Sequence, residues 1–166
     1  MKYNFKFKQL EEKDLPLLLK WFKEPHVDKW WPVPKEEEDF FNSFIKRIRD
    51  DIRKMYIVLC YNKPIGYIQC YKINFEKDAW LPKISGNVIG IDQFIGEPDF
   101  LHKGFGTLFI KEFIENLLEK ENDLKIIVDP DPENKAAIRC YEKVGFEKIG
   151  EFQAPWGPAL VMTYNK

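Results

Sequence analysis

The sequence predicts an α/β fold in which a mixed sheet of about seven strands is flanked by about four helices. Segments with apolar residues at every third or fourth position alternate with short β-rich runs. One five-residue apolar run lies between two strong helical patterns, as in a buried parallel pair of strands. With 166 residues, of which 45% are hydrophobic, the chain fits one domain over residues 1–166 and can bury a substantial core.

The first third of the chain is predicted to form one strand and two helices. Residues 4–9 alternate apolar and polar side chains, which is typical of a strand. Residues 11–22 place leucines on one face of a short helix, and residues 36–51 place phenylalanines and isoleucines on one face of a second. The three prolines of residues 25–34 predict a loop between these helices.

The remaining elements follow from β-rich runs and from two further amphipathic patterns. Apolar spacing predicts helices over residues 105–118 and 134–144, and the glycine at 145 is a typical helix C-terminus. A turn signal at residues 62–64 joins the first two β-rich runs into a hairpin. The predicted strands of this part are 55–61, 65–73, 87–95, 124–128, 147–152 and 159–164.

Composition excludes several classes of protein. A net charge of −1 does not suit a strongly basic nucleic-acid binder, and no run approaches the roughly 18 apolar residues needed to cross a bilayer. The chain starts without a signal-peptide pattern, and its three cysteines and two histidines lack the spacing of metal ligands. We therefore expect a cytoplasmic protein that binds no nucleic acid, membrane or metal, while its oligomeric state stays open.

Acidic residues gather in three segments of the chain. Residues 24–39 hold six acids against two lysines, and residues 88–100 and 129–134 each hold three acids and no base. If these segments converge, they suit a small cationic ligand. The alternative is that the acids lie on solvated loops and at helix N-termini, where negative charge is favoured anyway.

A glycine-containing turn over residues 102–107 follows a predicted strand and opens a predicted helix. Gly104 and Gly106 allow the backbone to approach a ligand closely, and Lys103 adds positive charge. Because the first N–H groups of a helix are unpaired, such a turn is typical of a pyrophosphate site. Glycines at these positions are equally consistent with a tight turn that binds nothing.

The helix predicted over residues 134–144 carries two polar groups on one face. Asn134 and Tyr141 are two helical turns apart, and the small Ala137 lies between them. This face offers an amide, a methyl and a phenol to an extended chain that contains amides. The simpler interpretation makes Asn134 a helix N-cap and Tyr141 a core aromatic.

Together these segments resemble the GNAT superfamily of acyl-CoA-dependent N-acyltransferases, from about Asn87 to Phe146. The resemblance implies that acetyl-CoA is the acetyl donor, that the turn binds its pyrophosphate, and that the preceding strand pairs with its pantetheine arm. It also implies that Tyr141 protonates the departing thiolate. One departure is Leu101, where the family often has Gln or Arg. The implied cofactor-binding residues are Gln93, Phe94, Ile95, His102, Lys103, Gly104, Phe105, Gly106, Thr107, Asn134, Ala137 and Tyr141.

Short sequence words narrow the resemblance to the aminoglycoside 6'-N-acetyltransferases over nearly the full length. These words are HVDKWW (26–31), PIGY (64–67), GIDQ (90–93), DPDP (129–132), AIRCYEK (137–143) and GPA (157–159). The resemblance implies a polycationic aminosugar as acceptor, for which the acidic segments give an independent physical reason. Whether antibiotic resistance or another amine acetylation is the native role stays open.

Asp92 is the leading catalytic candidate. An ammonium group cannot attack a thioester, and a carboxylate within hydrogen-bond reach both holds the amine and accepts its proton. Because an ordinary aspartate has a pKa of about 4 and is a poor base, positioning the amine is an equally good role. The further candidates for contact with the acceptor are Asp129, Trp31 and Glu97. The simpler interpretations are a satisfied strand end for Asp92 and a helix-entry cap for Asp129.

We expect direct transfer in a ternary complex rather than covalent catalysis, because Cys140 has no evident histidine partner. Two alternatives stay open. One is the same chemistry on another amine, such as a hydroxylamine intermediate of siderophore synthesis. The other is a non-catalytic acyl-CoA-binding domain, against which Asp92 and Tyr141 argue because a sensor needs neither a base nor an acid.

Overall fold

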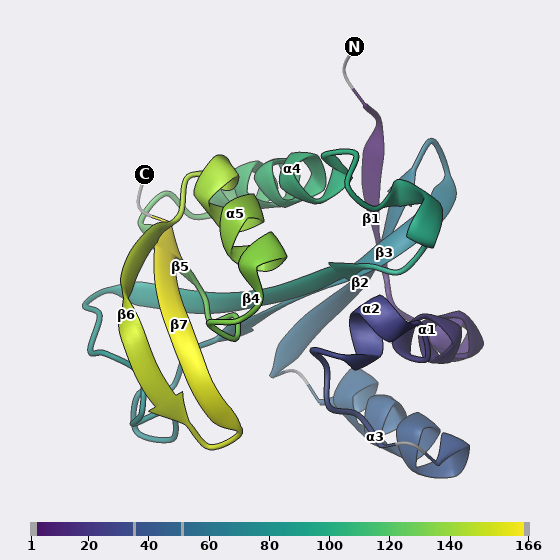
Figure 1. Ribbon diagram of the computed structural model, residues 1–166, viewed down its shortest axis with the longest axis horizontal. Helices are drawn as coiled ribbons and strands as arrows, with labels where there is room; N and C mark the ends of the chain where they lie inside the picture. The colour runs from purple at the N-terminus through teal and green to yellow at the C-terminus, as the bar shows by residue number, and fades with distance from the viewer. Residues whose placement is uncertain (1–2, 35, 51, 165–166) are drawn as a thin grey trace. The chain divides into compact units, whose positions relative to one another are not determined.

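The computed structural model describes residues 3–34, 36–50 and 52–164 (Figure 1). Its strands are β1 (Phe5–Gln9), β2 (Arg53–Cys60), β3 (Lys63–Lys72), β4 (Asn87–Ile95), β5 (Leu124–Val128), β6 (Glu147–Ala154) and β7 (Gly157–Tyr164). Its α-helices are α1 (Leu15–Phe22), α2 (Pro25–Asp28), α3 (Glu37–Arg49), α4 (Phe105–Lys120) and α5 (Lys135–Val144). Two short 3-10 helices are η1 (Glu12–Asp14) and η2 (Pro98–Phe100).

The predicted mixed sheet is confirmed. The seven strands hydrogen bond in the order β1-β2-β3-β4-β5-β7-β6. β4 and β5 pair in parallel, with Val88 opposite Lys125, whereas β1–β2, β5–β7 and β6–β7 are antiparallel pairs. The described residues form five α-helices instead of about four, and the additional one is α2.

The helices near the N-terminus differ from the prediction in two ways. The segment expected to be a loop begins with the one-turn helix α2, because Pro25 occupies the first helical turn, where its missing N–H costs nothing. The helix expected from residue 11 starts as η1, whose entry is a capping box in which the Glu11 N–H donates to Asp14 Oδ2 at 3.0 Å. Asp51, the expected end of the second helix, lies outside the described residues, and α3 ends at Arg49.

The hairpin between β2 and β3 turns through two residues. Tyr61 and Asn62 have φ angles of 49° and 64°. Positive φ at both central residues is the signature of a type I′ turn, whose twist matches the flanking strands. The turn is therefore one residue earlier than the signal at 62–64 indicated, and Pro64 lies inside β3.

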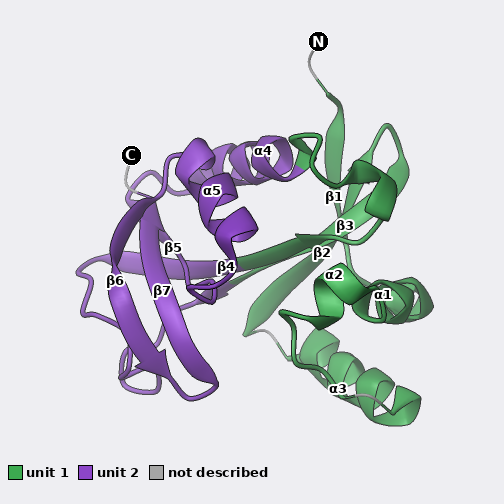
Figure 2. Ribbon diagram, in the orientation of Figure 1, with its two compact units in different colours: residues 1–70, 92–105 green, residues 71–91, 106–166 purple. Residues whose placement is uncertain are grey.

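The chain packs as two compact units (Figure 2). Unit 1 contains residues 1–70 and 92–105, and unit 2 contains residues 71–91 and 106–166. The strand β4 changes unit at Asp92, so the carboxyl-terminal part of this strand and the turn after it belong to unit 1. The helices α4 and α5 belong to unit 2, apart from Phe105 at the start of α4.

Each unit has its own hydrophobic core. The core of unit 1 is rich in aromatic side chains from α1, α3 and β3, with Trp21, Phe40 and Tyr67 at 0%, 0% and 1% exposure. A cluster in unit 2 joins β4, β5 and β7 through Val88, Ile127 and Val161. Within the described part of the chain, no helix is long and apolar enough to span a membrane.

Candidate active site

A chain of hydrogen bonds in unit 1 ends on the carboxylate of Asp92. The Tyr67 hydroxyl donates to Gln69 Oε1 at 2.8 Å, and Gln69 Nε2 donates to Asp92 Oδ2 at 2.7 Å. Because side chains alternate along a strand, Tyr67 and Gln69 lie on the same face of β3. Gln69 is 4% exposed, whereas Asp92 is partly exposed. A buried amide therefore holds one oxygen of a carboxylate that water still reaches.

Burial keeps the Tyr67 hydroxyl protonated. Removal from water raises the pKa of Tyr67 well above its usual range, and the negative charge of Asp92 adds to this effect. The nearby guanidinium groups of Arg47 and Arg53 act in the opposite direction and do not reverse it. Tyr67 is accordingly a hydrogen-bond donor throughout the working pH range of the protein.

Two aromatic rings contact Tyr67 at the start of this hydrogen-bonded chain. The Phe94 ring stacks on Tyr67 with a centroid separation of 5.4 Å and meets Trp31 edge-on at 5.2 Å. Trp31 also lies edge-on to Phe22 at 5.7 Å and stays partly exposed. The structure thus brings Trp31, a predicted acceptor contact, and Phe94 into one cluster with Tyr67.

Glu97, another predicted acceptor contact, is engaged by two donors from α1. Its Oε1 accepts from the indole N–H of Trp21 at 2.8 Å and from Lys20 Nζ at 3.2 Å. The hydrogen bond from Trp21 contributes most to lowering the pKa of Glu97 below its usual value, and the contact with Lys20 lowers it further. The bond from a fully buried tryptophan ties the loop after β4 to α1.

The end of β4 is anchored in the same region of unit 1. The N–H groups of Gly96 and Glu97 both donate to the Ile65 carbonyl, at 2.9 and 3.2 Å. His26 Nε2 lies 2.8 Å from the Ile95 carbonyl oxygen. A carbonyl oxygen has two lone pairs, so Ile95 keeps acceptor capacity for a ligand beside the strand.

The turn after β4 has the properties of an anion site. His102 and Gly104 have φ angles of 57° and 84°, and a Cβ added at Gly104 meets nothing within 4 Å. Residues 102–104 are exposed. Phe105 then begins α4, whose first N–H groups lack intrahelical partners. Exposed backbone donors at a helix N-terminus fit a pyrophosphate.

The predicted polar face of α5 lies in unit 2. Asn134 is the N-cap of α5, and its Oδ1 accepts from the Ala137 N–H at 3.2 Å. This bond uses the amide oxygen and leaves the amide N–H groups as potential donors to a ligand. Tyr141 is 8% exposed, and its ring meets Phe146 edge-on at 5.6 Å. Asn134 is thus a helix N-cap and Tyr141 a largely buried aromatic, and both positions are compatible with a role in cofactor binding.

The first turn of α4 contacts α5 next to Tyr141. Thr107 Oγ1 lies 3.4 Å from Cys140 Sγ. Burial raises the pKa of the Cys140 thiol, which disfavours the reactive thiolate. The described residues include no group of three or more His, Cys, Asp or Glu side chains that could hold a metal ion.

Asp129 follows β5 directly in unit 2. The next residue, Pro130, accepts a hydrogen bond at its carbonyl from the Leu160 N–H at 2.8 Å, which fixes this segment against β7. Asp131 Oδ1 accepts from the Glu133 N–H at 2.8 Å and so forms the turn that leads to α5. The N-cap of α5 is Asn134.

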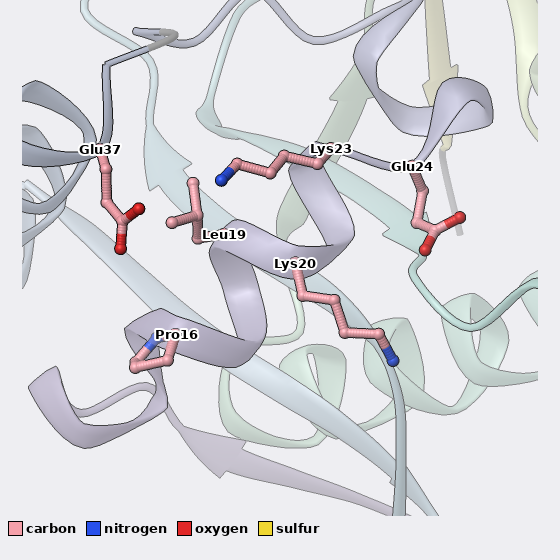
Figure 3. A pocket seen from close by; sticks show the side chains of 6 residues that line it. All are labelled: Pro16, Leu19, Lys20, Lys23, Glu24 and Glu37. Atoms are coloured by element: carbon pink, nitrogen blue, oxygen red, sulfur yellow. The ribbon is translucent and has the colours of Figure 1, made fainter.

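A surface hollow of about 420 Å³ lies elsewhere on unit 1 (Figure 3). Its lining comes from α1 and from the starts of α2 and α3, namely Pro16, Leu19, Lys20, Lys23, Glu24 and Glu37. Two carboxylates of the first acidic segment face this hollow together with two lysines, so its charge is balanced. The hollow contains none of the predicted site residues.

Sequence reasoning missed Gln69 and Tyr67. The available signal was a single amide within the apolar run Ile65–Ile73, since a buried polar side chain in a strand needs a partner. Its partner, Asp92, is 23 positions away in the sequence and on a different strand.

The chain is similar to known acetyltransferases over most of its length. The model of the "Acetyltransferase (GNAT) domain" family matches residues 11–154. The aminoglycoside N(6')-acetyltransferase type 1 of Klebsiella pneumoniae is 33% identical over 165 residues, which cover 95% of this chain and 81% of that protein. The N-hydroxyputrescine acetyltransferase of Acinetobacter baumannii is 26% identical over 80% of this chain and 61% of its own length.

A solved structure agrees with these relatives. The aminoglycoside acetyltransferase AAC(6')-Ib, in complex with coenzyme A and kanamycin, superposes with a TM-score of 0.82 at 31% identity. The likeness covers 98% of this chain and 95% of that one. With the turn at the start of α4 and the capped helix α5, these matches establish that the chain belongs to the GNAT acetyltransferase family.

Proposed function

We propose that this GNAT protein, as one domain over residues 1–166, transfers an acetyl group from acetyl-CoA to the 6'-amine of an aminoglycoside. The observation that carries the choice of acceptor is the 33% identity to an aminoglycoside N(6')-acetyltransferase over 95% of the chain. The solved relative that holds coenzyme A and kanamycin supports both the donor and the acceptor. The reaction is direct attack in a ternary complex.

The donor is bound by the backbone of β4 and by the turn that follows it. Residues 93–95 offer strand N–H and carbonyl groups to the pantetheine arm, and residues 102–107 offer helix N-terminal donors to the pyrophosphate. Asn134 supplies amide N–H groups beside Ala137, whose small side chain allows close approach. Acetyl-CoA supplies the acetyl group as a thioester.

Asp92 and Tyr141 carry the proton transfers. Asp92 holds the 6'-ammonium group and takes up its proton directly or through water, because it is a partly exposed carboxylate. Tyr141 provides its hydroxyl proton to the sulfur that leaves. The further contacts to the acceptor are Asp129, Trp31 and Glu97. Of these, Glu97 contributes a charge at the edge of the acceptor site, next to Lys20.

The test follows thiol release from acetyl-CoA with a panel of acceptors. We expect turnover with kanamycin-like compounds that bear a 6'-amine and none with compounds that bear a 6'-hydroxyl. The panel includes hydroxylamines, because the N-hydroxyputrescine acetyltransferase is also a relative. Turnover with hydroxylamines alone supports that second acceptor class, and absence of turnover with every aminoglycoside refutes the proposal.

Two variants test the residue roles. Asp92→Asn should lose about two orders of magnitude or more in kcat, the contribution of a general base, while binding acetyl-CoA with unchanged affinity. Tyr141→Phe keeps the ring against Phe146 and should lower kcat with no change in acetyl-CoA affinity. Calorimetric titration with acetyl-CoA measures the affinity. Loss of acetyl-CoA binding in Asp92→Asn contradicts the assignment of Asp92 to the acceptor.

A further inference from the structure

We propose that Gln69 is a positioning residue whose amide orients the carboxylate of Asp92, and that the Tyr67 hydroxyl stabilises this orientation of the amide by donating to its oxygen. The inference rests on the proposed function, because it concerns the residue that handles the acceptor amine. Its basis is the hydrogen-bonded chain from the Tyr67 hydroxyl to Gln69 Oε1 and from Gln69 Nε2 to Asp92 Oδ2.

A glutamine side chain has two nearly isosteric orientations, and they differ in what they present to Asp92. With the NH₂ group toward Asp92, Gln69 donates a charge-assisted hydrogen bond to the carboxylate. With the carbonyl toward Asp92, two acceptors face each other and the bond is lost. Gln69 is 4% exposed, so little water is available to compensate for the second orientation.

Both neighbours of Gln69 favour the first orientation. The carboxylate of Asp92 only accepts and therefore faces the NH₂ group, while the Tyr67 hydroxyl donates to the carbonyl oxygen. The ring itself is fixed, since it stacks on Phe94 and is met edge-on by Trp31. The hydrogen bond from Tyr67 thus stabilises the orientation in which a donor of Gln69, and not an acceptor, meets Asp92.

An oriented carboxylate benefits catalysis more than binding. Asp92 has to face the attacking nitrogen in the geometry of attack, and a displacement of about 1 Å in such a contact costs roughly 100-fold in rate. Once the bond from Gln69 is removed, Asp92 can still attract a cationic acceptor by charge. The loss should therefore fall mainly on kcat and less on the KM of the aminoglycoside.

The test is a double-mutant cycle on kcat in the acetyl-CoA assay with a 6'-amino acceptor. Gln69→Met keeps the length of the side chain and removes both polar atoms, so kcat should fall roughly 10- to 100-fold. Tyr67→Phe keeps the ring and removes the hydroxyl, so kcat should fall roughly three- to tenfold. In the Gln69→Met background, Tyr67→Phe should cause no further loss, because its effect passes through Gln69.

The matched control is Ile68→Met. It places the same new side chain one position along β3, on the opposite face of the strand, and should leave kcat within about twofold of the wild type. Acetyl-CoA affinity and melting temperature are measured for every variant. A general loss of structure lowers acetyl-CoA binding as well as kcat, whereas the proposed role leaves binding unchanged.

The outcomes separate this inference from the proposed function. If the wild-type protein acetylates no aminoglycoside, the proposed function fails. If the wild type is active and Gln69→Met retains its kcat, or if the two substitutions are additive, the positioning role is refuted. Should Gln69→Met fail to fold, Gln69→Leu replaces it. This variant also removes both polar atoms of the side chain, and an unchanged kcat again overturns the inference.

Discussion

Replacing Gly96 with alanine should destabilise unit 1 through a clash with Trp21. A Cβ added at Gly96 lies 2.2 Å from Trp21 Cδ2 and 2.3 Å from Cγ. Carbon atoms in contact are about 3.5 Å apart or more, so the ring or the backbone has to move by roughly 1.3 Å. Trp21 is fully buried and donates to Glu97, so the ring has little room to move and a hydrogen bond to lose.

The expected cost is about 2–4 kcal/mol. Overpacking of this kind costs about 1–3 kcal/mol, and a strained or broken bond to the partly exposed Glu97 carboxylate adds to it. For a chain of this length, each kcal/mol lowers the melting temperature by about 2–4 °C. Gly96→Ala should therefore melt about 5–15 °C below the wild type in calorimetry or circular dichroism.

The matched control is Gly150→Ala on β6. A Cβ there meets Phe152 at 3.5 Å, which is ordinary van der Waals contact, so the melting temperature should stay within about 2 °C of the wild type. Gly96 also starts the loop that connects β4 to the turn at 102–104, and its substitution should raise the KM for acetyl-CoA. Equal melting temperatures for Gly96→Ala and Gly150→Ala would show that the packing against Trp21 is not rigid.

Two further predictions concern α5 and the loop after β4. Asn134→Asp keeps an oxygen that caps the Ala137 N–H but lacks amide donors, so its melting temperature should equal that of the wild type while its KM for acetyl-CoA rises. Asn134→Ala removes the cap as well, so it should raise the KM and in addition lose about 1 kcal/mol of stability. An unchanged KM for Asn134→Asp rules out the amide contact. Because the pKa of Glu97 is lowered in the folded state, its charge stabilises the fold above the unfolded value near 4.5, and this contribution is lost as the pH falls through the folded value. Glu97→Gln should therefore melt below the wild type at pH 7, and the gap should narrow as the pH falls through the folded-state value; a gap that is independent of pH contradicts this account.

Sequence patterns predicted the elements well where the signal is local. Each of the seven strands lies where a β-rich run indicated, because alternation and β-branched composition act over a few residues. The turn at 102–104 was predictable for the same reason, as its glycine and the start of α4 are adjacent in the chain. The one-turn helix α2 was missed because proline is tolerated in a first helical turn as well as in a loop.

The partners of the site residues were not predictable from local pattern. Gln69 meets Asp92 because β3 neighbours β4 in the sheet, and Trp21 meets Glu97 across 76 positions of sequence. The sequence showed that residues 88–100 are acidic. It did not show that Asp92 binds a buried amide, whereas Glu97 binds an indole and a lysine. Strand order determines the first pairing, and the position of α1 beside the loop after β4 determines the second. Both depend on the whole fold and not on a local pattern.

The path of the chain through its two units constrains the order in which the protein can fold during synthesis. Residues 71–91 leave the ribosome before 92–105 complete unit 1, yet they belong to unit 2. Val88 has to wait for Ile127 and Val161 before its cluster can form, so the nascent chain exposes an apolar strand while some seventy further residues are made. Such an exposed strand is prone to wrong pairing with other chains. We expect expression yield to depend on chaperones and on growth temperature more than the stability of the finished protein indicates.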